Sequence, residues 1–344
     1  MYRLYPLTVT FVKSIMLPMA LLIILTILMG LAVGWSIGAN DAANSLGPAV
    51  GSKVVTLKQA IILISIFGLL GAILQGSYVT KTIGKGIVPM DRLDKSVAAY
   101  VALVACFAAA AWVVLATYWK MPISTSHSIV GAVAGAGLAI NAPVKWKVLL
   151  DIFICWIFTP IGAAILGYIF YRVFKNVLYA AIPRKYLKPV FTALIILSGC
   201  YVAYTWGAND VANATGVISG ANILSPMVSV VLGGLAIVLG IMTWGYKVIE
   251  TIGSEITNLL PIMAFSAQLA IAINVHIYTV FGVPVSTSHS IVGAIFGVGL
   301  VRGVRVVNIR IMKEIIICWL ATPFISGIIS FLVLKGLSIL LKIS

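Results

Sequence analysis

The chain has 344 residues, of which 62% are hydrophobic and only 9% are charged, and its formal net charge is +15. Soluble domains carry about 25% charged residues, so this composition excludes a soluble globular protein. The Lys and Arg residues are scattered between apolar runs and are not interleaved with aromatic residues, which argues against nucleic-acid binding. Because the apolar runs are continuous and not alternating, a membrane β-barrel is excluded as well. The sequence predicts an all-α polytopic membrane protein.

Apolar runs follow one another along the chain, most of them close to the roughly 20 residues that a membrane span requires. They lie near 16–37, 59–79, 97–119, 123–140 and 148–171, and then near 190–206, 226–246, 261–281, 285–301 and 314–341. The first run is longer than the apolar region of a signal peptide, so we interpret it as a true span. A basic stretch with Arg172, Lys175 and Arg184 separates the two sets. We therefore expect a first transmembrane repeat at 1–171, a short basic cytoplasmic linker at 172–188 and a second transmembrane repeat at 189–344.

The two sets are copies of one unit, because the same sequence motifs occur in the same order in both. The matching pairs are "GANDAAN" at 38–44 with "GANDVAN" at 207–213, "TKTIGKGI" at 80–87 with "IETIGSEI" at 249–256, "PISTSHSIVGAVAGAGL" at 122–138 with "PVSTSHSIVGAIFGVGL" at 284–300, and "DIFICWIFTP" at 151–160 with "EIIICWLATP" at 314–323. If each copy crosses the membrane an odd number of times, the copies have opposite orientations, as in many secondary transporters. We therefore expect two inverted-topology repeats, with the "STSHS" segments as re-entrant or half-helix hairpins.

The "GAND" motifs place Asp41 and Asp210 at membrane depth, at the ends of apolar runs. A charged side chain there costs at least about 2.5–3.5 kcal/mol, so a function is expected. Carboxylate and amide oxygens are hard ligands that suit Na⁺, and Gly38 and Gly207 are expected to loosen the helix so that backbone carbonyls contribute. The flanking amides are Asn40, Asn44, Asn209 and Asn213. The alternative is an ordinary helix cap, which the duplication of the whole heptapeptide makes less attractive.

The "STSHS" motifs read as helix N-termini that begin inside or beside the membrane, after Pro122 and Pro284. Free backbone N–H groups, the positive end of the helix dipole and clustered hydroxyls form a ready anion site. The alternative is that the serines only cap the helices. A Ser/His hydrolase built on His127 or His289 is disfavoured, because no orienting acid or oxyanion arrangement is indicated. We expect structural imidazoles bonded to the backbone, and we expect the glycines of "IVGA" and the residues that follow to form packing seams.

Charge links the two motifs. An aspartate near an oxyanion repels it unless a cation lies between them, so each ligand raises the affinity of the other. The expected outcome is symport of a cation and an anion, with the aspartates as the main ion-coupling acids.

The strings "GANDAANSLG" and "GANDVANATG" and the paired "P-[IV]-STSHSIVGA" resemble the inorganic phosphate transporter (PiT) family over residues 30–330. The resemblance implies phosphate uptake coupled to Na⁺ or H⁺, about 10–12 transmembrane segments including hairpins, and a homodimer. It also implies no enzymatic activity, no cofactor and no nucleic-acid partner, in a multi-pass protein of the cell (plasma) membrane. Two positions depart from the family pattern, since Ala42 replaces the usual valine and Gln268 replaces a glutamate that some relatives carry.

The resemblance implies further that phosphate and Na⁺ bind between the Asn-Asp motifs and the helix starts. The expected phosphate-binding residues are Asn40, Asp41, Ser124, Thr125, Ser126, Asn209, Asp210, Ser286, Thr287 and Ser288. The expected Na⁺ ligands are Asp41, Asn44, Asp210 and Asn213. We expect a secondary active transporter that imports inorganic phosphate by Na⁺ symport, with alternating access around a site near the bilayer midplane. An H⁺-coupled phosphate or sulfate permease and a passive anion channel are the alternatives.

Overall fold

The structure, a computed structural model, describes residues 17–51, 53–119, 121, 123–246, 249, 260–301 and 309–341, without the side chains of 51, 309–315 and 341. Within these ranges every regular element is a helix. Eight of the described helices are long and apolar enough to cross a membrane. The prediction of an all-α polytopic membrane protein is confirmed. The acids Glu250 and Glu255 and the residue Pro122 lie outside the described residues, as does most of the second copy of the "TIG" motif.

The helices recur in the same order in the two halves of the sequence. In the first half they are α2 (Met19–Asp41), α3 (Ala43–Gly51), α4 (Leu57–Lys81), the π-helical turn η1 (Thr82–Gly86), the short η2 (Met90–Arg92), α5 (Lys95–Tyr118), α6 (Thr125–Ala139) and α7 (Trp146–Ala181). In the second half they are α8 (Arg184–Gly220), α9 (Pro226–Gly240), the π-helical turn η3 (Ile241–Gly245), α11 (Pro261–Val280), α12 (Thr287–Leu300) and α13 (Ile309–Leu341). The helices α6 and α12 are shorter than the roughly 20 residues of a full span, as expected for half-helices.

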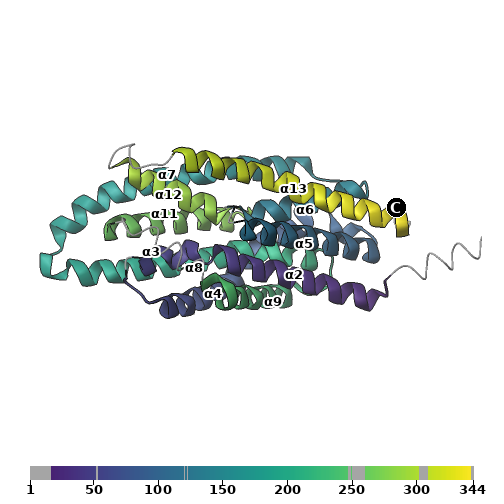
Figure 1. The fold of residues 1–344 in the computed structure, drawn as a ribbon, viewed down its shortest axis with the longest axis horizontal. Coiled ribbons are helices and arrows are strands. Elements are labelled where there is room, and N and C mark those ends of the chain that lie inside the picture. The colour runs from purple at the N-terminus through teal and green to yellow at the C-terminus, as the bar shows by residue number, and fades with distance from the viewer. Residues whose placement is uncertain are drawn as a thin grey trace, which may run out of the picture.

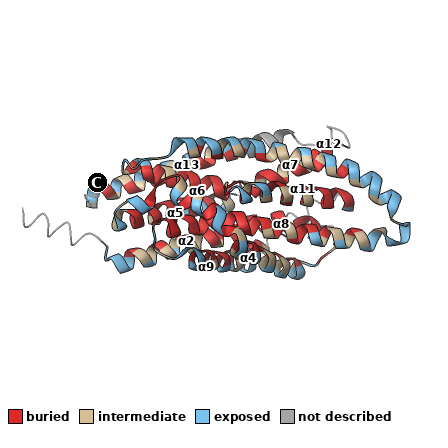
Figure 2. Ribbon diagram, turned by 180° about the vertical axis from the view of Figure 1, so that it is seen from behind, coloured by how far each residue is buried: buried red, intermediate tan, exposed pale blue. Residues whose placement is uncertain are grey.

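The predicted linker at 172–188 is helical except at its centre. The helix α7 continues through Arg172 and Lys175, and only Ile182 and Pro183 separate it from α8. The residue before a proline avoids the helical conformation, and Ile182 is extended accordingly, with φ −102° and ψ 121°. The basic residues therefore lie on the exposed tip of a helical hairpin, which is pale blue in Figure 2. The cytoplasmic position of this tip and the division into two repeats stay predictions.

Gly38 and Gly207 lie inside continuous helix, contrary to the expectation that they loosen it. The helix α8 runs through the second motif without a break, and the first motif is interrupted only at Ala42, between α2 and α3. The glycines serve close packing instead of loosening the helix. A Cβ atom at Gly207 would overlap the carbonyl oxygen of Gly68, and one at Gly38 would overlap that of Ile237. Small residues at these crossings let the backbones of neighbouring helices meet.

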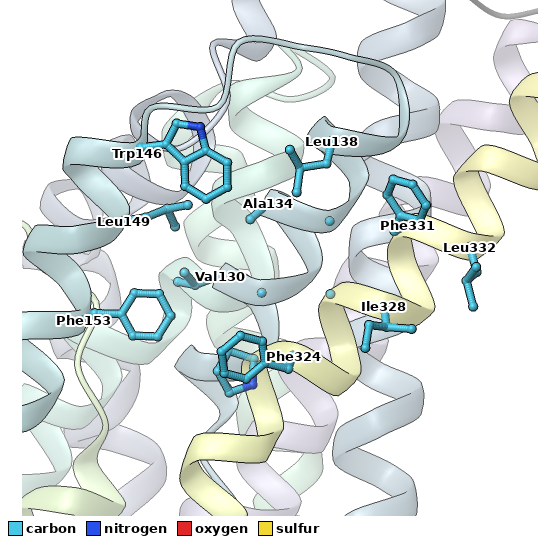
Figure 3. A pocket seen from close by; sticks show the side chains of 14 residues that line it. Val130, Ala134, Leu138, Trp146, Leu149, Phe153, Phe324, Ile328, Phe331 and Leu332 are labelled. Atoms are coloured by element: carbon cyan, nitrogen blue, oxygen red, sulfur yellow. The ribbon is translucent and has the colours of Figure 1, made fainter.

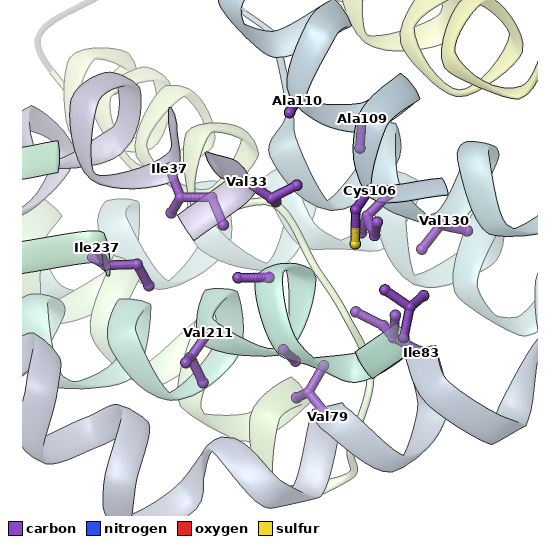
Figure 4. Close-up of a cluster of buried hydrophobic side chains, with 14 of the residues drawn as sticks. Val33, Ile37, Val79, Ile83, Cys106, Ala109, Ala110, Val130, Val211 and Ile237 are labelled. Atoms are coloured by element: carbon purple, nitrogen blue, oxygen red, sulfur yellow. The ribbon is translucent and has the colours of Figure 1, made fainter. Parts of the chain in front are cut away.

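The halves are interlaced, because helices of one half pack on helices of the other. The pairs are α4 with α8, α9 with α2, α6 with α13, and α12 with α7. Figure 1 shows the result as layers that run along the long axis, with α4 and α9 on one side and α7 and α13 on the other. The core between them contains Val33 of α2, Cys106 of α5 and Val211 of α8 (Figure 4). Each half therefore contributes to every layer.

Glycines of α6 and α12 form the predicted packing seams, and the two seams are equivalent. A Cβ atom at any of four positions would overlap a backbone carbonyl oxygen of the facing helix. The pairs are Gly131 with Pro323, Gly135 with Gly327, Gly293 with Pro160, and Gly297 with Ala164. These contacts fix α6 against α13 and α12 against α7, and so they set the position of both helix starts.

Two apolar grooves lie beside these seams. One, of about 330 Å³, is lined by side chains of α6, α7 and α13, among them Val130, Phe153 and Phe324 (Figure 3). A second, of about 530 Å³, lies between α7 and α13 over His127 and His289. Because Phe324 is 63% exposed on a helix that is apolar enough to span a membrane, this surface fits a hydrocarbon environment.

Candidate functional site

Two helix N-termini meet near the centre of the molecule, as the sequence predicted. The hydroxyl of Ser124 accepts the N–H of His127 (3.3 Å) at the start of α6, and Ser286 accepts that of His289 (3.2 Å) at the start of α12. The two imidazole rings lie 4.5 Å apart, and Figure 1 shows that α6 and α12 extend from there to opposite sides. The first turns leave backbone N–H groups without helical partners, so two positive helix ends face one region.

The carboxylate of Asp41 contacts both helix starts. It accepts hydrogen bonds from Thr125 Oγ1 (3.1 Å) of α6 and, at the limit of hydrogen-bond distance, from Ser288 Oγ (3.5 Å) of α12. The side-chain amide of Asn40 donates to it as well, at 3.0 Å. Asp41 is 2% exposed, although α2 is a candidate membrane span.

The carboxylate of Asp210 repeats this arrangement with the helices exchanged. It accepts from Thr287 Oγ1 of α12 and from Ser126 Oγ of α6, each at 3.5 Å. At each helix start, the threonine and the serine that follows it therefore contact different aspartates. Each helix start joins the two motifs, which the sequence alone does not indicate.

Asparagines complete the crosswise pattern. Asn44 donates to Ser288 (3.2 Å), and Asn213 donates to Ser126 (3.0 Å). The structure thus brings the predicted site residues together, except that Asn209 bonds the loop before α12 and, among the described residues, none of the other predicted site residues. Ser124 and Ser286 differ from the rest, because their hydroxyls accept backbone N–H groups as helix caps. The site is buried except at Asn40 and Ser288, which are half-buried.

The electrostatics of the site are unbalanced. Within the described ranges the one ion pair joins Lys85 and Asp91 (3.6 Å), both partly exposed, so neither Asp41 nor Asp210 has a basic partner there. An unpaired buried carboxylate destabilises a protein by on the order of several kcal/mol. The described residues also contain no group of three or more His, Cys, Asp and Glu side chains that would suit a transition metal. The arrangement therefore calls for a positive charge from outside, either a hard cation or protons.

The histidines hold the helix starts to the rest of the fold. His127 Nδ1 lies 3.1 Å from the carbonyl oxygen of Trp319, and its ring stacks on Trp156 at 3.6 Å. His289 makes the equivalent contacts with the carbonyl of Trp156 (3.3 Å) and the ring of Trp319 (3.6 Å). Structural imidazoles bonded to the backbone are confirmed. In the described structure neither ring bonds a serine hydroxyl, so no Ser/His catalytic pair is formed.

The site also contains two threonines that lie outside the sequence motifs. Thr117 donates to Asn40 Oδ1 (3.2 Å), and Asn209 donates to Thr279 Oγ1 (3.0 Å). Both threonines precede the cap serine of their half by the same distance in the sequence, which was an available signal. Gln268, also buried, joins Ser198 of α8 to the carbonyl of Ser45 of α3.

Comparison with known proteins decides the family. The profile of the PHO4 phosphate transporter family matches residues 37–330. The chain belongs to the phosphate transporter family. This transporter is 33% identical to a putative phosphate permease of Pyrococcus furiosus, over 86% of this chain and 91% of that protein. It is 28% identical to the chloroplastic inorganic phosphate transporter 2-1 of Arabidopsis thaliana, over 80% of this chain and 65% of that protein.

A solved structure, "The sodium-dependent phosphate transporter", superposes on this transporter with a TM-score of 0.86 and 31% sequence identity, covering 92% of this chain and 99% of that one. The family resemblance seen in the sequence is therefore confirmed, and the family is one of membrane transporters and not of enzymes.

Proposed function

We propose that this transporter imports inorganic phosphate together with Na⁺, by alternating access, across the cell membrane. The single observation that carries the proposal is the pair of buried carboxylates, Asp41 and Asp210, each bonded to both helix N-termini and lacking a basic partner within the described ranges. The similarity to a structure titled a sodium-dependent phosphate transporter supports Na⁺ as the coupling cation.

Phosphate is bound mainly by the helix N-termini. An oxyanion placed between α6 and α12 receives N–H groups and dipoles from two directions, together with hydroxyl donors. The proposed ligands are Asn40, Asp41, Ser124, Thr125, Ser126, Asn209, Asp210, Ser286, Thr287 and Ser288. A protonated oxygen of the anion can donate to a carboxylate oxygen, which favours hydrogen phosphate over sulfate.

Na⁺ is bound by the oxygens of Asp41, Asn44, Asp210 and Asn213. The amide nitrogen of Asn213 donates to Ser126, while its Oδ1 atom is buried and has no hydrogen-bond donor among the described residues. A buried acceptor without a donor costs about 1–3 kcal/mol, and a hard cation beside it removes that cost. The cation also neutralises the carboxylates that repel phosphate. Binding of each ion therefore strengthens binding of the other.

Uptake of radiolabelled phosphate into proteoliposomes tests the proposal. An inward Na⁺ gradient is expected to drive accumulation, whereas a K⁺ gradient of the same size is not, and excess sulfate is expected to compete poorly. Uptake that ignores Na⁺ and follows a proton gradient would overturn the cation assignment. Equilibration without accumulation would instead indicate a passive channel.

The aspartates can be tested as a matched pair. Asp41→Asn and Asp210→Asn keep the size of the side chain and remove a charged ligand, so the half-saturating Na⁺ concentration is expected to rise at least about tenfold in each. Asp91→Asn, in the exposed ion pair with Lys85, is the control and is expected to leave Na⁺ dependence unchanged. Unchanged Na⁺ dependence in both site variants would contradict the assignment.

The homodimer is part of the same proposal. Chemical cross-linking in membranes before solubilisation is expected to give a species of twice the monomer mass, and its absence over a range of linker lengths would contradict a dimer.

A further inference from the structure

The loops that precede α6 and α12 share one backbone hydrogen bond at equivalent positions. In the first loop the N–H of Met121 bonds the carbonyl of Ala116 (2.8 Å), and in the second the N–H of Val283 bonds the carbonyl of Tyr278 (2.9 Å). These positions are equivalent in the two copies of the sequence. The contacts that other elements make with the described residues of the two loops can therefore be compared position by position.

The second loop is clamped by three other elements. Asn209 of α8 bonds both the carbonyl of Val283 and the N–H of Val285, each at 3.1 Å. Thr82 donates to the carbonyl of Gly282 (2.6 Å), and the indole of Trp156 in α7 donates to the carbonyl of Pro284 (2.9 Å). The amide of Asn209 pairs with this extended segment as a neighbouring β-strand would, by using one carbonyl and one N–H on the same side.

Among the described residues, the first loop lacks the counterparts of the Asn209 and Trp156 contacts. The amide of Asn40 bonds Asp41 and Thr117 and makes no bond to Met121 or Ile123. The indole nitrogen of Trp319, the counterpart of Trp156, is buried without a hydrogen-bond partner among the described residues. Asn209 is fully buried, whereas Asn40 is half-buried. The two ends of a site that the sequence makes equivalent are therefore held differently in this structure.

We propose that Asn40 and Asn209 are alternating latches, meaning that each side-chain amide bonds the loop of its own half in one state and releases it in the other. In this structure the Asn209 latch is closed, because its amide bonds the loop, and the Asn40 latch is open. This inference rests on alternating access in the proposed function, and it names the residues that perform it. In the opposite state Asn40 bonds the carbonyl of Met121 and the N–H of Ile123, Trp319 finds an acceptor in the same loop, and Asn209 releases Val283 and Val285. The amide of a closed latch is occupied by the loop, so Asn40 and Asn209 bind phosphate in turn and not at the same time.

The latch controls access because the loop that it bonds leads directly into a helix start of the site. The extended segment 283–285 leads directly into the cap serine of α12, and the carbonyl of Val285 lies 3.0 Å from the hydroxyl of Ser126 at the start of α6. Holding this segment therefore also holds the two helix starts together on that side. On the other side Asn40 and Ser288 are both half-buried, so this end of the site is less enclosed than the end at Asn209.

Thiol labelling of the two loops tests the proposal. The four cysteines, Cys106, Cys155, Cys200 and Cys318, are replaced by alanine, and a single cysteine is introduced by Met121→Cys or by Val283→Cys. Both substitutions keep the backbone atoms that the latches bond. A small charged methanethiosulfonate reagent is applied to the purified protein in detergent, where both ends are accessible. We expect faster labelling at position 121 than at position 283.

The latch variants are expected to move labelling in opposite directions. Asn209→Ala raises the rate at position 283 about tenfold, as expected for the loss of two ordinary hydrogen bonds, and lowers the rate at position 121. Asn40→Ala does the reverse. Trp156→Phe keeps an aromatic ring against His127 and removes the bond to the loop, so it acts in the same direction as Asn209→Ala. Trp319→Phe is the matched variant at the other end and is expected to act in the same direction as Asn40→Ala, because its indole has no acceptor in this structure and finds one only in the opposite state.

Labelling requires no transport, so the two proposals can fail separately. Equal rates at the two positions, or variants that raise both rates together, would overturn the latch even if uptake is driven by Na⁺. If Asn209→Ala does not yield a folded protein, the contrast between Trp156→Phe and Trp319→Phe decides the question, and equal effects of these two would refute it. Opposite shifts without any phosphate uptake would support the latch and refute the proposed function.

Discussion

The glycine seam between α6 and α13 can be tested by replacing Gly131 with alanine. The added Cβ would overlap the carbonyl oxygen of Pro323 and lie 2.7 Å from its carbonyl carbon, whereas ordinary contacts begin at 3.4 Å, so α6 must retreat by at least about 0.7 Å. The obstacle is backbone and cannot rotate away. Overpacking of this kind costs about 1–3 kcal/mol.

The retreat has a functional consequence. Thr125 begins the same helix and lies 3.1 Å from Asp41, so a displacement of this size is enough to break the bond. We expect Gly131→Ala to lower the thermal stability of the detergent-solubilised protein. We also expect it to raise the half-saturating concentrations of both phosphate and Na⁺ in proteoliposomes.

The control for this prediction lies on α13. A Cβ at Gly336 would meet nothing within 4 Å, and replacing a helical glycine with alanine at such a site stabilises a protein by about 0.4–1 kcal/mol. Gly336→Ala is therefore expected to melt slightly higher than the parent and to transport normally. If Gly131→Ala melts and transports like Gly336→Ala, the close approach of α6 and α13 is wrong.

Three further predictions concern single contacts. Gln268→Glu replaces the donor to the Ser45 carbonyl with a carboxylate, and it should lower stability by about 1–3 kcal/mol in thermal unfolding, whereas unchanged stability would contradict the bridge. Ser126→Ala removes a contact of Asp210 and Asn213, so it should weaken Na⁺ dependence and phosphate uptake together, and a change in only one would contradict the shared site. Hydrogen bonds from the Ser96 hydroxyl and amide hold the pKa of Asp94 below its usual range. A lowered pKa stabilises the fold above the ordinary carboxyl range, so the stability advantage over Asp94→Asn should disappear on acidification, and a constant difference would refute it.

The chemistry of the site could be predicted from the sequence, but its connections could not. Duplicated Asp and Ser/Thr motifs indicate which groups meet, because membrane-depth polar residues need partners. The exchange of partners, in which Thr125 bonds Asp41 and Ser126 bonds Asp210, depends on the angle at which α6 enters the site. No local pattern encodes that angle, which is set by the glycine seams.

The prediction that Gly207 loosens its helix was wrong. A glycine before a polar motif favours either a loosened helix or a close helix crossing, and only the carbonyl of Gly68 facing it decides for the crossing. The basic linker is helical on both sides of Ile182 and Pro183, since Lys and Arg are good helix formers. Pro183 was the available signal, since it limits the break to itself and the residue before it.

The exchange of helices between the halves constrains how the protein is made. The helix α6 leaves the ribosome early, but the surface that its glycines fit belongs to α13, which is the last described helix to be synthesised. A nascent chain that has reached only residue 300 has inserted the first serine-rich helix start without its permanent neighbour. Completion of the ion site is thus delayed until α13 has been synthesised. Two separately expressed halves should regain activity only when they are produced together.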